Sequence, residues 1–250
     1  MLIQVKKSTK IQSENKVFLI GKITDLNGTD FPLRQIDYFK SSLKSDKFAF
    51  TNDAGVFTFV CKVENLSENG GKEAVRKLGN DVFQVAKDKC KDLSIIGDSA
   101  EGIELFAEGF SLSSYSFEKY LSKDRKAKVT LSKVSTTNQK ADLKSVNSIV
   151  EATAWSRDLV NEPLSYLTAT QLSEEIREKC GAVGVKVDVF RKKKIESLKM
   201  GGLLAVNKGS IDPPTFTVME WKPNKVLNSK PIVLIGKGIV YDTGGLSLKP

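Results

Sequence analysis

The chain has 250 residues, of which 39 are Lys or Arg and 30 are Asp or Glu, so its formal net charge is +9. Hydrophobic residues make up 40% of the sequence. A chain of this length and apolar content can bury a substantial core. The composition excludes a disordered protein, a collagen and a disulfide-rich miniprotein.

Two residue types limit the chemistry. The sequence contains no histidine, which removes the usual serine or cysteine triad, His-ligated zinc sites and His general bases. Any catalysis would therefore use carboxylates, lysines, hydroxyl groups or metals held by oxygen. Cys61, Cys90 and Cys180 are odd in number and form no CxxC pair, so we predict reduced, buried thiols rather than a disulfide or zinc-thiolate framework.

Apolar runs are short along the whole chain. Tight clusters such as residues 232–235 are only four residues long, far below the roughly 18 residues of a membrane-spanning helix. Residues 1–7 have neither the apolar stretch nor the small-residue cleavage site of a signal peptide. These features predict a soluble, cytoplasmic protein with no membrane partner.

The positive charge is spread evenly along the sequence. Residues 1–144 carry 24 basic and 19 acidic side chains, and residues 145–250 carry 15 and 11. The one basic run, 191–194, is followed by Ile195 and Leu198 at helical spacing and has no interleaved aromatic residues. We interpret it as the solvated first turn of a surface helix, and we do not expect DNA as a partner.

The first half of the sequence alternates between strand and helix patterns. β-branched and aromatic runs predict strands at 17–21, 56–60 and 93–97, and alternation predicts another at 128–134. Apolar residues with helical spacing predict helices over 72–91 and about 100–109. This order is typical of an α/β domain with a largely parallel sheet.

A polar stretch without periodicity, 135–140, is the candidate domain boundary, which gives domains 1–140 and 141–250. After it, the pattern predicts a helix from about residue 146 that Pro163 ends, and another over 169–180. Strands are predicted at 185–190, 203–206, 216–221 and 231–235.

The last predicted strand leads into a loop in which Gly236 and Gly238 flank Lys237, with Asp242 five residues further on. Ligands of α/β sheets usually bind just beyond the carboxyl ends of strands. The Lys–Asp pair is consistent with a plain ion pair in a structural turn. It is also consistent with a metal site in which a divalent cation binds the carboxylate and a neutral amine. The phosphate-loop patterns GxxxxGK[ST] and GxGxxG are both absent from this segment.

Three segments resemble the leucyl aminopeptidases, the cytosol aminopeptidases of peptidase family M17. They are residues 155–168, which begin WSRDLVNEP, residues 199–214, which begin KMGGLLAVNKGS, and residues 236–250, GKGIVYDTGGLSLKP. They occur in the family's order. The resemblance implies a macro-like N-terminal α/β domain over residues 1–140, matched only weakly, followed by the start of an α/β metallopeptidase domain.

The resemblance also implies site residues and cofactors. Lys237 matches the family's lysine ligand of one metal, and Asp242 matches the aspartate that bridges two metals. Lys249 matches the catalytic lysine that polarises the substrate carbonyl. Family enzymes use two divalent ions, zinc, manganese or magnesium, to release N-terminal amino acids, leucine in particular, from peptides.

Further family ligands belong to an NTDAEGR-type motif, which is absent here, and the sequence ends at Pro250. We therefore expect an incomplete metal site and a chain that is inactive alone. The resemblance implies peptide substrates with a free N-terminus and a homo-hexamer for the full-length protein. The alternative function is a non-catalytic module that binds nucleic acid or a nucleotide through the N-terminal domain.

Overall fold

The computed structural model describes residues 2–240. The chain divides into two compact units, Met1–Asp158 and Leu159–Pro250. The domain boundary predicted after residue 140 lies just before a long helix, α4 (Leu143–Asn161), and remains a prediction.

A six-stranded sheet forms the centre of the first unit, with the strand order β1-β6-β5-β2-β4-β3. Every neighbouring pair is parallel except β3 and β4, which are antiparallel. The prediction of a largely parallel α/β sheet is therefore confirmed. The strands are β1 (Val5–Lys7), β2 (Lys16–Ile20), β3 (Phe48–Asp53), β4 (Val56–Lys62), β5 (Asp92–Gly97) and β6 (Lys133–Thr136).

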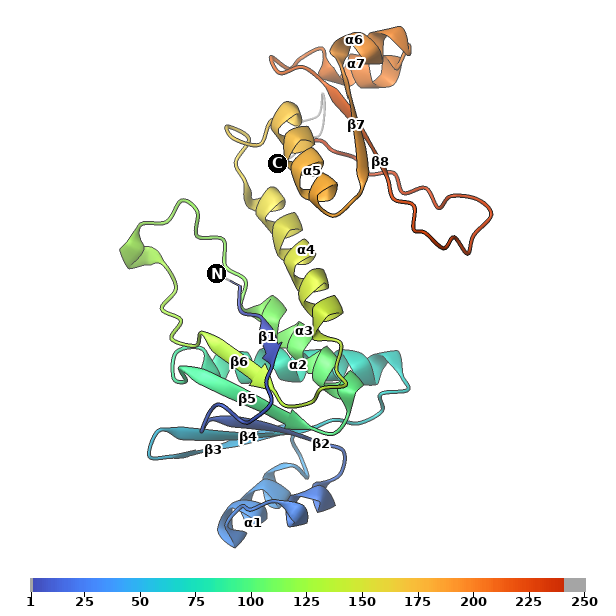
Figure 1. Cartoon of the computed structure of the whole chain (residues 1–250). Helices are drawn as coiled ribbons and strands as arrows, with labels where there is room; N and C mark the ends of the chain where they lie inside the picture. Colours follow the sequence, from blue (N-terminus) through green and yellow to red (C-terminus); the bar gives the residue numbers. More distant parts are fainter. Residues whose placement is uncertain (1, 241–250) are drawn as a thin grey trace. The chain divides into compact units, whose positions relative to one another are not determined.

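Helices cover both faces of this sheet. Figure 1 shows α2 (Asn69–Ala86) and α3 (Ala100–Ser113) on one face and α1 (Leu33–Ser42) on the other. Side chains alternate along β4 in the same way, since Phe57, Phe59 and Cys61 join the core beneath α2 and α3 while Val60 joins the core beneath α1. Both faces of the strand are buried, which explains its nearly continuous apolar sequence. The short 3₁₀ helices are η1 (Ile23–Gly28) and η2 (Lys123–Arg125).

Two glycines let α2 and α3 pack with their backbones in contact. A Cβ atom on Gly109 would lie 2.0 Å from the Arg76 carbonyl oxygen, and one on Gly79 would lie 2.3 Å from the Phe106 carbonyl oxygen. No side chain fits at those distances. Beside this contact, the Arg76 Nε atom donates a 2.9 Å hydrogen bond to the Glu108 carboxylate.

The first half of α4 belongs to the core of the first unit. Leu143, Val146 and Val150 are buried in the same apolar cluster as α2 and α3. Their spacing of three and four residues puts them on one helical face.

The second unit is built around a two-stranded antiparallel sheet of β7 (Lys186–Arg191) and β8 (Thr215–Glu220). The helix α5 (Ala169–Ala182) packs on it through Ser173, whose hydroxyl donates to the Thr215 hydroxyl over 2.7 Å. Two short helices, α6 (Lys192–Ser197) and α7 (Gly201–Asn207), lie between the strands in the sequence. The core is small: within residues 159–240 the buried side chains are Leu167, Ser173, Ile195 and Pro214.

Several predicted elements need correction. The strand predicted at 203–206 is wrong, because these residues lie in the helix α7. The strand predicted at 231–235 is also wrong, because the segment has no regular structure and its side chains Ile232, Val233, Leu234 and Ile235 are 71–94% exposed.

A further correction concerns the strand predicted at 128–134 and the irregular stretch predicted to follow it. The strand β6 begins only at Lys133 and continues to Thr136. Ser135 and Thr136, the first two residues of the polar stretch 135–140, are therefore buried strand residues, because parallel partners lie on both sides of β6. The basic run at 191–194 begins a helix as predicted, with Ile195 fully buried.

In the part of the chain that the structure describes, no helix has both the length and the apolar character needed to cross a membrane.

Candidate functional site

Lys237 lies in the irregular segment that follows β8, and its side chain is exposed. This segment passes close to α5, since a Cβ atom on the neighbouring Gly238 would be 3.7 Å from a methyl carbon of Leu172. The predicted metal ligand is thus held near a helix of its own unit rather than at the end of a strand.

Asp242 and Lys249, the other two predicted site residues, lie outside the described residues 2–240. The structure therefore does not test whether they come together with Lys237, and the three-residue site remains a prediction.

The described residues alone do not fit a metal ion. Across residues 2–240, no three His, Cys, Asp or Glu side chains are grouped closely enough to hold one. Lys237 is the one predicted ligand in this range, and a neutral amine supplies no negative charge to balance a divalent ion. A metal site that includes Lys237 needs carboxylates from outside the described part of the chain.

The motif that begins at Trp155 has a clear structural role. It forms the last two turns of α4, where the Arg157 guanidinium lies 3.9 Å above the centre of the Tyr115 ring. The Tyr115 hydroxyl donates a 2.8 Å hydrogen bond to the Asp158 carboxylate, and the Arg157 guanidinium donates to the Leu112 carbonyl oxygen over 3.2 Å. These contacts fix α4 against the C-terminal end of α3.

The motif that begins at Lys199 forms the turn between α6 and α7. The Lys199 backbone has a φ of 52°, and its amide donates to the Glu196 carbonyl oxygen over 2.9 Å. A left-handed residue at this position ends α6 and lets the chain reverse before Gly201 begins α7. This motif therefore builds local structure as well.

Sequence reasoning missed Tyr115 as the partner of Arg157 and Asp158. More than forty residues separate it from them in the sequence, so no local spacing could reveal the pair. It also missed the surroundings of the basic run at 191–194, which are described below, because the lining residues come from three separate segments.

The fold defines the chain as an α/β protein whose mixed six-stranded sheet is covered by helices on both faces and is followed by a second, smaller α/β unit. Solved structures share this arrangement. The bottromycin maturation enzyme BotP in complex with Mn aligns with a TM-score of 0.73 at 22% identity, over 96% of this chain and 51% of that chain. A tomato leucine aminopeptidase variant aligns with a TM-score of 0.62 at 18% identity, over 87% of this chain and 50% of that chain.

Sequence comparisons identify the family. The model of the catalytic domain of the cytosol aminopeptidase family matches residues 154–250. A probable cytosol aminopeptidase of Chloroherpeton thalassium is 51% identical over 102 residues, which is 41% of this chain and 20% of the relative. One from Brucella suis is 35% identical over 188 residues, 72% of this chain and 37% of the relative. The chain belongs to the cytosol aminopeptidase family, peptidase family M17.

The matches cover only part of each relative. The most extended of those compared, with a probable cytosol aminopeptidase of Clostridium tetani, is 29% identical over 252 residues and spans 95% of this chain but 52% of the relative. The chain thus spans about half, or less than half, of the length of these relatives.

Proposed function

We propose that this chain is part of a metal-dependent aminopeptidase that releases N-terminal amino acids, of leucine type, from peptides. The observation that carries the proposal is the family match over residues 154–250, because this range includes all three residues that the resemblance assigns to the site. Relatives named probable cytosol aminopeptidases are 51% and 56% identical over 102 and 95 residues of this chain.

In this proposal Lys237 and Asp242 are metal ligands, and Lys249 contacts the carbonyl group of the substrate. A neutral amine and a carboxylate suit zinc or manganese, and magnesium to a smaller degree. Two divalent ions need more than one carboxylate to balance their charge. We therefore expect these 250 residues to lack peptidase activity without additional acidic ligands.

The proposal includes several features that the family resemblance implies. The substrates are peptides with a free N-terminus, the compartment is the cytoplasm, and the complete protein is a homo-hexamer. The first 140 residues form a macro-like α/β domain, and residues 141–250 begin the metallopeptidase domain.

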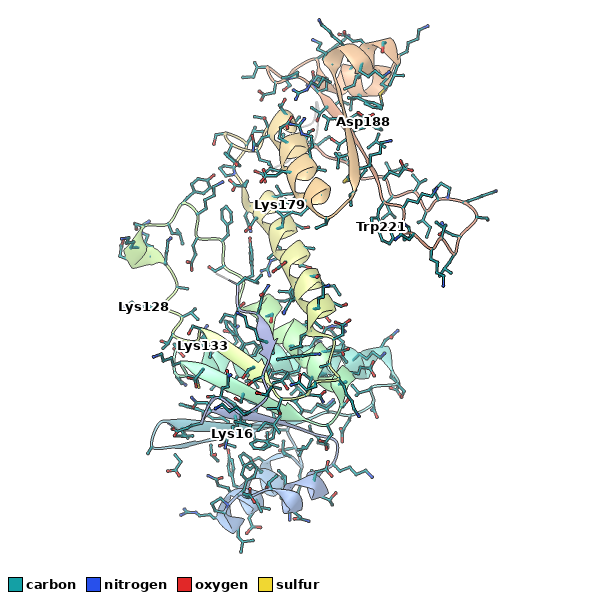
Figure 2. All side chains as sticks on the ribbon, in the orientation of Figure 1. Lys16, Lys128, Lys133, Lys179, Asp188 and Trp221 are labelled. Carbon is teal, nitrogen blue, oxygen red and sulfur yellow. The ribbon has the colours of Figure 1, made fainter. Side chains whose placement is uncertain are left out.

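A segment exchange tests this function. Residues 154–250 replace the matching segment of the Chlorobaculum parvum relative, which is 56% identical over 95 residues. We expect the chimaera to hydrolyse leucinamide when Mn²⁺ is supplied, and we expect Asp242→Ala in the chimaera to abolish both this activity and the binding of one equivalent of metal. Asp188→Ala is the matched control, since Asp188 is an exposed aspartate on β7 (Figure 2).

Two outcomes would contradict different parts of the proposal. A folded chimaera that binds metal but hydrolyses no aminoacyl amide contradicts the proposed function. Full activity of the Asp242→Ala chimaera with its metal intact contradicts the assigned ligand.

The second candidate function is the binding module, and one structural observation favours it. Lysines that are distant in sequence come together because the backbone amides of Thr130 and Ser132 donate to the carbonyl oxygens of Lys87 and Lys91, over 2.8 and 3.0 Å. The lysines on these two segments are Lys87, Lys89, Lys91, Lys126, Lys128 and Lys133, of which two are labelled in Figure 2.

Acidic residues interrupt this lysine-rich surface, since Asp88 and Asp92 belong to the same segments. A nucleic-acid site would make affinity fall steeply with salt. Titration of a duplex and of a single strand at two salt concentrations tests it, and binding that is absent at low salt contradicts it.

A further inference from the structure

A cavity of about 280 Å³ lies in the second unit, and Lys237 is not among the residues that line it. Three parts of the chain form it: the first turn of α5, the junction between β7 and α6, and the start of β8. The lining residues are Thr170, Arg191, Lys192, Lys193, Pro213, Pro214 and Thr215.

The charged residues that line the cavity are all positive, because three are basic and none is acidic. The Arg191 guanidinium is anchored on α5 by a 2.8 Å ion pair with Glu174. Glu174 also pairs with Arg177, so one carboxylate is shared between two guanidinium groups. Within the described residues, Lys192 and Lys193 form no ion pair and no side-chain hydrogen bond, which leaves their ammonium charges for a ligand.

The walls of the cavity are largely carbon. The lining residues that provide this apolar surface are two prolines, two threonines and the carbon chains of the three basic residues. Lysine and arginine can lay their stems along such a wall while their charges stay in water at the rim. The Thr215 hydroxyl is already engaged, since it donates to the Ala169 carbonyl oxygen over 3.1 Å.

The frame around the cavity is well defined. Thr215 lies opposite Arg191 in the β7–β8 ladder, and its hydroxyl accepts a 2.7 Å hydrogen bond from the buried Ser173 on α5. Pro214 is buried and restricts the backbone directly before β8. These contacts hold the three segments that line the cavity without using either lysine.

We propose that this cavity binds a small organic anion, a carboxylate or phosphate group carried on a compact apolar body. The anionic group lies between Lys192 and Lys193, and the apolar body lies on the prolines. A volume of about 280 Å³ suits a small molecule rather than a folded partner.

N-acetyl-L-leucine is the first probe, and its amide is the matched neutral ligand. The acetyl group removes the free amine that an aminopeptidase site would need, so the result does not depend on the proposed function. We expect saturable changes in the backbone amide resonances of Thr170 and Thr215 with the acid and at least tenfold weaker changes with the amide. Isopentyl phosphate forms a parallel arm, and the tighter of the two acids identifies the anionic group.

The charge requirement is tested with the double variant Lys192→Met/Lys193→Met. We expect its affinity for the anion to fall about tenfold, as for the loss of two exposed ion pairs. The control is Lys179→Met/Lys208→Met, which removes two exposed lysines of the same unit outside the cavity (Lys179 is labelled in Figure 2). Unchanged resonances along the β7–β8 ladder away from the cavity show that the second unit of each variant is folded.

Three results would overturn the proposal: equal affinity for the acid and the amide, an equal loss in the control variant, or shifts that do not saturate with either acid.

Discussion

The hydroxyl of Tyr115, which follows α3, donates a 2.8 Å hydrogen bond to the carboxylate of Asp158 near the end of α4. The Arg157 guanidinium lies over the same ring, 3.9 Å from its centre. One tyrosine thus contacts two consecutive charged residues, one through its hydroxyl and one through its face. This contact ties the family motif in α4 to the six-stranded domain.

We predict that Tyr115→Phe lowers the free energy of unfolding by about 1–2 kcal/mol, because it removes a hydrogen bond to a charged group and keeps the ring under Arg157. Urea unfolding followed by circular dichroism measures the change. Tyr38→Phe is the control, since Tyr38 is 46% exposed and its hydroxyl makes a longer bond of 3.3 Å to the Phe50 carbonyl oxygen. Equal losses in the two variants would show that the Tyr115–Asp158 bond has no special importance.

A second prediction concerns the contact between α2 and α3. Gly109→Ala places a methyl group 2.0 Å from the Arg76 carbonyl oxygen, so the helices must separate. We expect a destabilisation of about 3 kcal/mol, measured by urea unfolding. Gly70→Ala is the matched control on α2, because its added carbon has no neighbour within 4 Å beyond the adjoining backbone of its own helix, and it should be neutral or slightly stabilising. A small loss for Gly109→Ala would mean that the helices can separate at little cost.

The buried thiols give a third prediction, a dependence of stability on pH. Burial, with a smaller effect from Asp81, raises the pKa of Cys61, and burial, with smaller effects from neighbouring charges, raises the pKa of Cys90 to about 11. Between the ordinary value of 9.0 and about 11, the folded protein keeps the Cys90 proton that the unfolded chain loses. The stabilisation is complete below pH 9 and is lost as the pH rises.

The measurement compares the free energy of unfolding at pH 8 and pH 10 for the parent chain and for Cys61→Ala/Cys90→Ala. The parent should lose more stability over this interval than the double variant, since the two proteins differ only in these two thiols. In thiol-labelling experiments on the folded protein, Cys180, which is only partly buried, should react well before the other two cysteines. Fast labelling of Cys61 would contradict its buried position.

The fourth prediction concerns Lys249 in the chimaera described above. If this lysine stabilises charge that develops on the substrate carbonyl, Lys249→Ala should lower kcat on the order of a hundredfold and leave the metal content unchanged. Metal analysis and leucinamide kinetics on the same sample provide the two measurements. Lys230→Ala, which removes an exposed lysine, is the control. A parallel loss of metal and turnover would assign Lys249 to metal binding instead.

The elements that the sequence predicts well are those whose apolar residues recur at a regular spacing because one face of the element is buried. The helix α2 was predicted from Val75, Leu78 and Val82, and these side chains are buried in the structure. By contrast, the apolar run at 203–206 has no period that separates a strand from a helix, and it lies in α7, whose first two residues are glycines. The run at 231–235 has the composition of a strand, but a strand also needs a hydrogen-bonded partner, and a local pattern cannot supply one.

The helix α1 was not predicted, because its buried residues Ile36 and Phe39 are too few to establish a period in a mainly polar segment. The candidate site was predicted mainly from family resemblance. Spacing alone left Lys237 and Asp242 open between an ion pair and a metal site, and the described residues do not decide between them.

The helix α4 has a practical consequence for dissecting this protein. The family match begins at residue 154, in the middle of α4, whereas the buried face of that helix starts at Leu143. A gene boundary or protease cut at residue 154 would divide one continuous helix between two polypeptides. The buried residues Val146 and Val150 would then lie in a helix that has lost its C-terminal part. A cut in the loop between Asn161 and Ala169 would leave the helix whole, so each half of the chain is best expressed from that loop.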